Sequence, residues 1–182
     1  MVLCGIDEAG RGPLAGPLTI AGVILHNPIE GLNDSKKLTE KKREALFDII
    51  RDNSSYHIAR FSAAQIDELG LSACLASGLR EIMEALGEAD YLYDGNSKFG
   101  VSGLRTMVKA DATIPEVSAA SILAKVSRDR EMVELSTTYP EYGFEGHKGY
   151  GSATHIEAIR QYGYCEIHRK SFKLKVLQPS LF

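Results

Sequence analysis

The sequence predicts an α/β protein in which helices cover both faces of a single sheet. Short runs rich in Val, Ile, Leu and Thr alternate with longer segments whose apolar residues recur at helical spacing. The strands come first as a cluster and then alternate with helices, which is typical of a sheet covered on both sides. With 182 residues and 44% hydrophobic content, the chain is expected to form one domain, residues 1–182, that ends in a short basic tail.

The expected elements follow from local signals. Thr39, Ser62 and Ser152 can each accept a hydrogen bond from a backbone N–H and so begin a helix. Pro115 suits the first residue of another helix, and residues 140–151 form a loop rich in Gly and aromatic residues. Strands are expected at residues 1–6, 18–25, 56–61, 90–93 and 104–108, and helices at 40–52, 62–70, 72–86, 115–138 and 152–163.

Composition excludes several classes of protein. The longest apolar runs fall far short of the roughly 20 residues that cross a membrane, and no basic segment precedes an apolar one at the N-terminus, so no signal peptide is expected. Three widely spaced cysteines without a C-x-x-C pair indicate a reducing, cytoplasmic protein rather than a disulfide or zinc framework. A net charge of -3 argues only weakly against nucleic acid, because local patches decide binding.

Four carboxylates follow apolar runs directly or within two residues. Asp7 and Glu8 follow the first expected strand, Asp94 the fourth and Asp111 the fifth. If these strands are parallel neighbours, the acids gather at one edge of the sheet, where ligands collect in α/β proteins. Clustered oxygen ligands without His or Cys indicate Mg²⁺ or Mn²⁺. Because successive strand residues face opposite ways, Asp7 and Glu8 share an ion only if the strand twists or ends between them.

The acids are followed by a loop suited to phosphate esters. Gly10 and Gly12 lack a Cβ, so their backbone can approach a ligand closely, and Arg11 lies between them as a cation. Each feature has a plainer interpretation. Asp7 and Glu8 could be solvated at an ordinary turn, Asp94 could belong to a turn with the glycine after it, and Asp111 could simply precede a helix.

Further cations and one aromatic ring are candidates for nucleic-acid contacts. Ser121, Lys125 and Arg128 fall at i, i+4 and i+7 of the long helix, which makes one stripe that is either a phosphate track or a solvated face. Lys36 lies in a polar loop and either clamps a backbone or is a surface lysine. Tyr150, flanked by glycines, could stack on a sugar or base, or could cover the edge of the core.

Together these segments resemble the ribonuclease HII family, the type 2 ribonucleases H. The resemblance is carried by segments 5–13, 34–38, 93–95, 109–111, 119–129 and 147–151, and it spans the chain from about residue 5 to residue 172. It implies a ribonuclease H-like fold, a mixed five-stranded central sheet flanked by helices on both faces. It also implies an endonuclease that hydrolyses the RNA strand of RNA–DNA hybrids and cuts 5′ of single ribonucleotides in duplex DNA.

The resemblance assigns roles to individual residues. Asp7, Glu8, Asp94 and Asp111 correspond to catalytic acids that hold two divalent cations, Mg²⁺ or Mn²⁺, and the products carry 3′-OH and 5′-phosphate ends. A monomer with roles in ribonucleotide excision repair and DNA replication is implied. The residues that correspond to nucleic-acid contacts are Gly10, Arg11, Gly12, Lys36, Ser121, Lys125, Arg128 and Tyr150.

Three alternatives remain. A non-catalytic hybrid-binding module would keep the acids without cleavage. The sister type 3 ribonucleases H typically have Gly-Thr-Gly where this chain has Gly10-Arg11-Gly12, and they carry an N-terminal domain for which the few residues before Asp7 leave no room. A small α/β phosphatase would instead hydrolyse phosphomonoesters.

Overall fold

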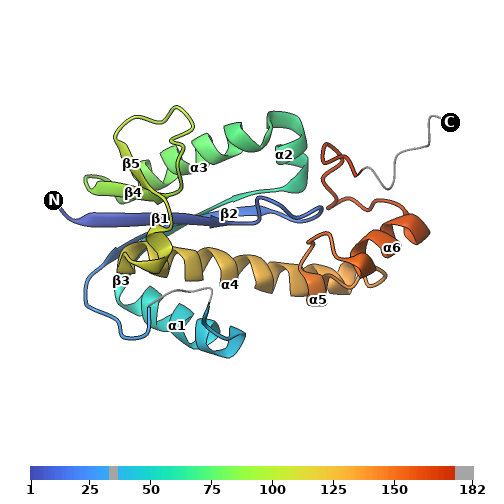
Figure 1. The fold of residues 1–182 in the computed structure, drawn as a ribbon, viewed down its shortest axis with the longest axis horizontal. Coiled ribbons are helices and arrows are strands. Elements are labelled where there is room, and N and C mark those ends of the chain that lie inside the picture. Colours follow the sequence, from blue (N-terminus) through green and yellow to red (C-terminus); the bar gives the residue numbers. More distant parts are fainter. Residues whose placement is uncertain (33–36, 175–182) are drawn as a thin grey trace.

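The centre of the protein is a five-stranded sheet in the order β3-β2-β1-β4-β5 (Figure 1). The computed structural model describes residues 1–32 and 37–174. β2 pairs antiparallel with β1 and β3, whereas β4 and β5 run parallel to β1 and to each other, so the expected mixed sheet is confirmed. The strands are β1 (Leu3–Ala9), β2 (Leu18–Leu25), β3 (Ser54–Phe61), β4 (Asp90–Asp94) and β5 (Leu104–Met107).

Helices cover both faces of this sheet, with α3 on one side and α4 and α1 on the other (Figure 1). Thr39, Ser62 and Ser152 accept the expected N-terminal hydrogen bonds, and Pro115 is the first residue of α4. The helical elements are α1 (Glu40–Asp52), α2 (Ala63–Leu69), α3 (Leu71–Leu86), η2 (Ala110–Ala112), α4 (Pro115–Thr138), α5 (Phe144–His147) and α6 (Ala153–Tyr162).

Two apolar clusters fill the space between the sheet and its helices. Ile20 of β2 and Leu79 of α3 are buried between the sheet and α3, and Val23 of β2 and Leu123 of α4 are buried on the side of α4. Gly5 allows α4 to approach β1 closely, because a Cβ there would lie 2.3 Å from the backbone nitrogen of the helix's third residue. The start of α4 is therefore pressed against β1, a short distance before the two acids of that strand.

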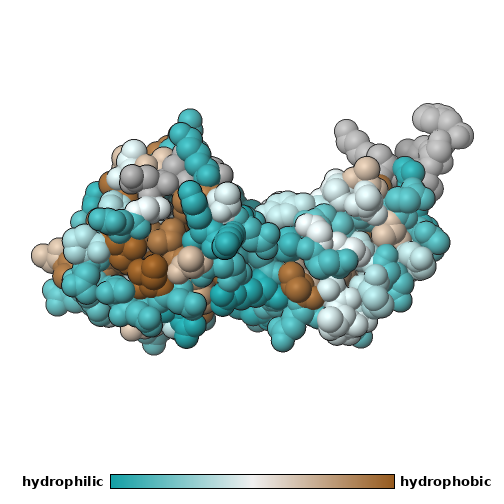
Figure 2. All heavy atoms as spheres, turned by 90° about the horizontal axis from the view of Figure 1, so that it is seen from below, coloured by the Kyte–Doolittle hydropathy of each residue, from teal (hydrophilic) through white to brown (hydrophobic). Residues whose placement is uncertain are grey.

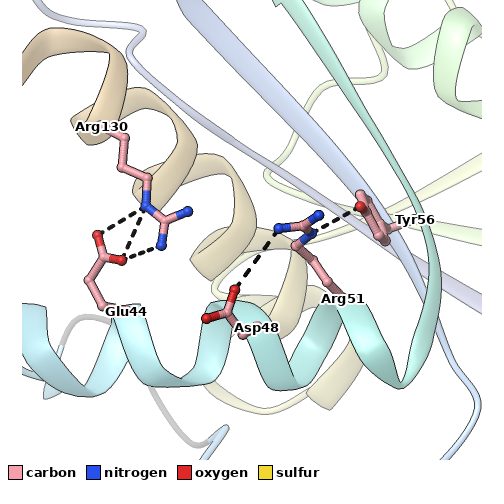
Figure 3. A network of polar contacts seen from close by, with 5 residues as sticks. All are labelled: Glu44, Asp48, Arg51, Tyr56 and Arg130. Carbon is pink, nitrogen blue, oxygen red and sulfur yellow. Dashed lines mark hydrogen bonds and ion pairs between the residues drawn. The ribbon is translucent and has the colours of Figure 1, made fainter. Parts of the chain in front are cut away.

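Polar contacts fix α1 against its neighbours (Figure 3). Arg130 of α4 donates to both carboxylate oxygens of Glu44 and lies 4.3 Å from the Phe47 ring centroid. At the other end of α1, Arg51 donates to the Tyr56 hydroxyl of β3 at 3.1 Å and lies 3.9 Å from Asp48. α1 is thereby held at a fixed position beside α4.

A third apolar cluster lies beyond the end of the sheet, where α5 and α6 pack against the end of α4 (Figure 1). Phe144 and Met132 are fully buried there, beside Ala15 of the loop that joins β1 to β2. The segment expected as a plain loop, residues 140–151, therefore contains the short helix α5. Phe144 supplies the buried ring that anchors this turn.

Several element boundaries differ from those expected. β1 continues through Ala9, which pairs with Thr19, so Asp7 and Glu8 lie inside the strand rather than in the loop after it. β3 starts at Ser54 because its pairing with β2 extends to Leu25. Smaller shifts occur where α3 begins at residue 71 and β5 ends at residue 107.

The surface on the side of α1 and α4 is mostly hydrophilic, with a larger apolar patch toward the end that carries the N-terminus (Figure 2). Within residues 1–32 and 37–174, none of the helices combines the length and apolar character that crossing a membrane requires.

Candidate active site

Three carboxylates converge at the end of the parallel strands. Asp7, Asp94 and Asp111 each offer an oxygen, and these oxygens lie within 4.8 Å of one another. The register explains the first two: Ile6 of β1 pairs with Tyr93 of β4, so the next residue along each strand, an aspartate in both cases, projects from the same face. The convergence predicted from three remote segments is confirmed for these aspartates.

Asp111 reaches this position by a route that the sequence did not indicate. The chain leaves β5 at Met107, and Lys109 then adopts a left-handed conformation with φ of 58°, which is uncommon for a residue with a Cβ. The 3₁₀ turn η2 follows, and the backbone N–H of Asp111 donates to Asp94 Oδ2 at 3.4 Å. The third acid therefore comes from a turn before α4 and not from a strand end.

Glu8 is placed differently from the three aspartates. Strand alternation turns it to the face that carries Ile6 and Tyr93, opposite to Asp7. Its Oε1 lies 3.3 Å from Arg11 Nη1. Its Oε2 is buried and, among the described residues, has no hydrogen-bond partner, and the same is true of the Tyr93 hydroxyl. Glu8 nevertheless lines the same cavity as the aspartates.

The acid cluster is electrostatically strained. Burial, followed by the charges of Glu8 and Asp94, raises the pKa of Asp7 well above its ordinary value. Burial, followed by the hydrogen bond and charge of Asp111, raises the pKa of Asp94 to about 6. Carboxylates held this close disfavour each other's ionised form. Such a cluster becomes favourable when a cation neutralises it, which is the property of a metal site.

The acids line one side of a cavity of about 590 Å³. Arg43 of α1 also lines it and was not foreseen, because it ends a run of three basic residues with no spacing signal. Its Nη1 donates to the Leu38 carbonyl at 2.6 Å. The predicted Lys36 falls outside the described residues. The predicted nucleic-acid residues that line the cavity are Gly10, Arg11, Gly12, Ser121, Lys125 and Tyr150.

The two glycines of the loop serve different purposes. Gly12 has no heavy atom within 4 Å of where a Cβ would be, so its bare backbone faces open space. Gly10 has φ of 94°, and a Cβ there would lie 2.4 Å from Arg128 Nε and 2.6 Å from the Pro17 carbonyl oxygen. Gly10 is therefore required by the protein's own packing, and the open approach expected for both glycines is found at Gly12.

Arg128 is not a surface cation, and its predicted contact with the duplex backbone stays a prediction. The residue is 1% exposed. Its guanidinium donates to the carbonyls of Pro17, Ala15 and Lys148 at 2.8, 2.9 and 2.8 Å. Helical spacing correctly placed it on one stripe of α4 with Lys125, but the loops after β1 and after α5 cover that end of the stripe.

The basic tail also differs from expectation, because Arg169 is 1% exposed. It donates to the carbonyls of Gly10, Arg11, Gly16 and Pro17 at 2.6, 3.1, 3.0 and 3.0 Å. No sequence pattern marked this residue, since its partners are backbone oxygens more than 150 positions away.

Comparisons with known proteins agree with this architecture. A ribonuclease H2 from Pyrococcus horikoshii OT3 superposes with a TM-score of 0.77 at 33% identity, over 95% of this chain and 94% of that one. The ribonuclease HII of a complex with PCNA from Archaeoglobus fulgidus gives 0.82 at 29% identity, covering 100% and 98%. A ribonuclease HIII in complex with Mn²⁺ gives 0.75 at 18% identity, covering 94% and 67%, which supports the fold alone. The fold and the acid cluster thus define a ribonuclease H-like protein.

Sequence comparison specifies the family. The ribonuclease HII family model matches residues 4–175. A ribonuclease HII from Sulfurovum sp. (strain NBC37-1) is 64% identical over 181 residues, covering 99% of this chain and 96% of that protein. One from Campylobacter hominis is 64% identical over 183 residues, covering 100% and 99%. The chain belongs to the ribonuclease HII family and is therefore a ribonuclease H, an endonuclease of the hydrolase class.

Proposed function

We propose that this enzyme hydrolyses the RNA strand of RNA–DNA hybrids and cuts 5′ of single ribonucleotides in duplex DNA, leaving 3′-OH and 5′-phosphate ends. The observation that supports this most directly is the cavity itself. Asp7, Asp94 and Asp111 lie on one wall, and the bare backbone of Gly12 lies nearby in the same cavity. Carboxylates that can hold a metal ion, beside a backbone amide that a ribose can approach, are groups suited to a ribonuclease.

The residues present fit two divalent cations, Mg²⁺ or Mn²⁺. All ligand atoms are carboxylate oxygens, which these ions prefer. Burial and the neighbouring carboxylates raise the pKa values of Asp7 and Asp94, and a bound cation would offset both effects. The Oε2 of Glu8 is buried and, among the described residues, has no hydrogen-bond partner, so it is available to a cation. We assign the ions to Asp7, Asp94, Asp111 and Glu8. Bound there, they would activate a water and stabilise the leaving 3′ oxygen.

The rest of the cavity would bind and orient the substrate. The N–H and Cα of Gly12 can approach a ribose without a side chain between them, and the 2′-OH is the group by which a protein distinguishes RNA from DNA. Tyr150 is 43% exposed, so its ring is available to pack on a sugar. Lys125 and Arg43 supply positive charge for phosphates, and Ser121 supplies a hydroxyl.

We further infer that the enzyme acts as a single-domain monomer in the cytoplasm, in repair of ribonucleotides and in DNA replication. Two of its cysteines, Cys4 and Cys74, are buried thiols, which suits a reducing compartment.

Cleavage of matched duplexes tests the proposal. A duplex with one ribonucleotide is compared with its all-deoxy twin, with Mg²⁺, with Mn²⁺ and with chelator. We expect a single cut 5′ of the ribonucleotide with either ion, and none in chelator or in the twin. Binding without cleavage would instead indicate a hybrid-binding module, and hydrolysis of a phosphomonoester alone would indicate a phosphatase.

A further inference from the structure

Two buried arginines, Arg169 and Arg128, donate hydrogen bonds to the loop of residues 10–17. Arg169 donates to the carbonyls of Gly10 and Arg11, and both Arg169 and Arg128 donate to the carbonyl of Pro17. Neither arginine lines the cavity. Within the described part of the chain, every hydrogen bond that the two guanidinium groups donate goes to a backbone carbonyl.

Burying the two positive charges of this pair costs free energy, so we expect the two arginines to do more than fill space in the core. Burial lowers the pKa of Arg128, and burial together with the charge of Arg128 lowers the pKa of Arg169 to about 10. A buried cation is tolerated when dipoles satisfy it. Here the dipoles are peptide carbonyls of the loop after β1 and, for Arg128, also the carbonyl of Lys148, and the arginines in turn fix the orientation of these peptides.

Backbone hydrogen bonds extend the same unit. Leu14 donates to the Gly149 carbonyl, Gly16 donates to the Ile167 carbonyl, and Arg169 donates through its own N–H to Leu14, each at 2.8 Å. The loop after β1, the loop that carries Tyr150 and the segment around Arg169 are therefore joined into one layer behind the cavity.

The geometry of the peptide bond links the hydrogen bonds that Arg169 donates to the direction of the N–H groups in the same loop. In a trans peptide the C=O and the N–H point in opposite directions, and the described chain has no cis peptide. The Gly10 carbonyl and the Arg11 N–H belong to one peptide, and the Arg11 carbonyl and the Gly12 N–H belong to the next. Because Arg169 holds both carbonyls, both N–H groups point away from it, and Arg11 and Gly12 are the residues that line the cavity.

We propose that Arg169, with Arg128 as its support, is a positioning residue that aims the N–H groups of Arg11 and Gly12 at the nucleotide and thereby sets the preference for ribose over deoxyribose. The inference rests on the proposed function and deepens it. Arg169 acts directly on the two peptides that face the cavity. Arg128 donates instead to the carbonyls of Ala15, Pro17 and Lys148. Its effect on the preference for ribose over deoxyribose is therefore smaller.

The test is Arg169→Lys, which keeps the charge but replaces the planar fork of the guanidinium, whose three nitrogens reach four carbonyls, by a single nitrogen with three donors. The matched control is Arg160→Lys on α6, where the arginine is exposed and lies 3.6 Å from Glu157. For each protein, kcat and KM are measured on the duplex with one ribonucleotide. Dissociation constants are measured in chelator for that duplex and for its all-deoxy twin.

We expect Arg169→Lys to raise KM about tenfold with kcat within about threefold, and to reduce the ratio of the two dissociation constants about tenfold, the equivalent of one or two hydrogen bonds. Arg160→Lys should match the wild type. A variant that only melts at a lower temperature, with unchanged KM and unchanged discrimination, has lost a merely structural residue and overturns the proposal.

A surface variant keeps the proposal testable if Arg169→Lys does not fold. Asp67 on α2 accepts from the backbone N–H groups of Lys170 and Ser171 at 3.0 and 2.9 Å and so anchors the segment beside Arg169. Asp67→Asn should lower discrimination in the same direction, by about threefold, since the amide keeps one acceptor oxygen, now uncharged, for the two backbone N–H groups that the carboxylate binds with separate oxygens. Unchanged discrimination would overturn the inference. A wild type that fails to cut the ribonucleotide duplex refutes the proposed function instead.

Discussion

Two groups of like charge lie on either side of the loop after β1, and they are satisfied in opposite ways. The acid group, Asp7, Asp94 and Asp111, has its carboxylates within 4.8 Å of one another, and the pKa values of Asp7 and Asp94 are raised. The arginine pair, Arg128 and Arg169, is buried more deeply, but the guanidinium groups donate to carbonyls of their own chain.

The difference separates a binding site from a structural support. A cluster whose charge the fold leaves uncompensated is suited to a partner from outside, here a cation. A cluster whose charge the backbone compensates needs no ligand and instead fixes the backbone around it.

The largest effect is expected at the acid group. Asp7→Asn should reduce cleavage at least about a thousandfold, because metal catalysis contributes several kcal/mol of transition-state stabilisation, while hybrid binding in chelator stays largely intact. Cleavage of an embedded ribonucleotide and a binding titration measure both. The control is Asp90→Asn at the far end of β4, where the carboxylate is paired with Arg105. Near-normal turnover by Asp7→Asn would refute the role of this acid.

At the arginine pair the main loss should be of stability. Arg169→Met leaves the carbonyls of Gly10, Arg11, Gly16 and Pro17 without these donors. Leaving a buried acceptor without its donor costs about 1–3 kcal/mol, which urea unfolding can detect. Arg160→Met, at an exposed position, should change the free energy of unfolding by less than about 0.5 kcal/mol. Equal effects of the two substitutions would contradict the structural role.

Divalent cations should stabilise the wild type by neutralising the acid group. At a concentration about a hundred times the dissociation constant, the gain is about 2.7 kcal/mol, or a rise in melting temperature of roughly 5–11 °C for a chain of this size. Chelator should reverse it. Asp7→Asn should show a much smaller rise. An equal rise in both proteins would place the bound ions elsewhere.

The smallest effect is a pH dependence that arises in the layer behind the cavity. His155 and His168 lie with their Nε2 atoms 2.9 Å apart. Burial lowers the pKa of both, and with the charge of His155 it brings that of His168 to about 4. The unfolded chain then binds more protons below its pKa of about 6.5, so stability falls as pH drops from about 6.5 toward 4.

The acid group changes stability in the opposite direction over much of this range. A raised carboxyl pKa means that the folded state binds protons first, so acidification favours folding. In metal-free buffer the melting temperature of Asp7→Asn should therefore fall more steeply between pH 6.5 and 4.5 than that of the wild type. Asp67 and Asp90, whose pKa values are lowered, lose their contributions only at lower pH. If the melting temperatures of the two proteins fell in parallel as the pH is lowered, the opposite effects expected of the histidines and the acid group would be contradicted.

Local signals in the sequence were sufficient for most of the fold. The hydrophobic periods located every strand and the main helices, and Thr39, Ser62 and Ser152 marked helix starts, because a helix cap and an amphipathic pattern involve residues a few positions apart. The extension of β1 through Asp7 and Glu8 was missed, since two acids resemble a turn until the partner strand pairs with them.

The candidate site likewise has a part that local sequence signals predict and a part that they do not. The sequence by itself determined that Asp7 and Asp94 stand at the ends of apolar runs, and it predicted that they meet if the two strands are parallel neighbours, which the structure confirms. Only the tertiary structure decided that Asp111 arrives from a turn and that Arg128 and Arg169 lie beneath the loop. Their partners are backbone carbonyls, which every residue carries, so no residue pattern can reveal in advance which ones an arginine will bind.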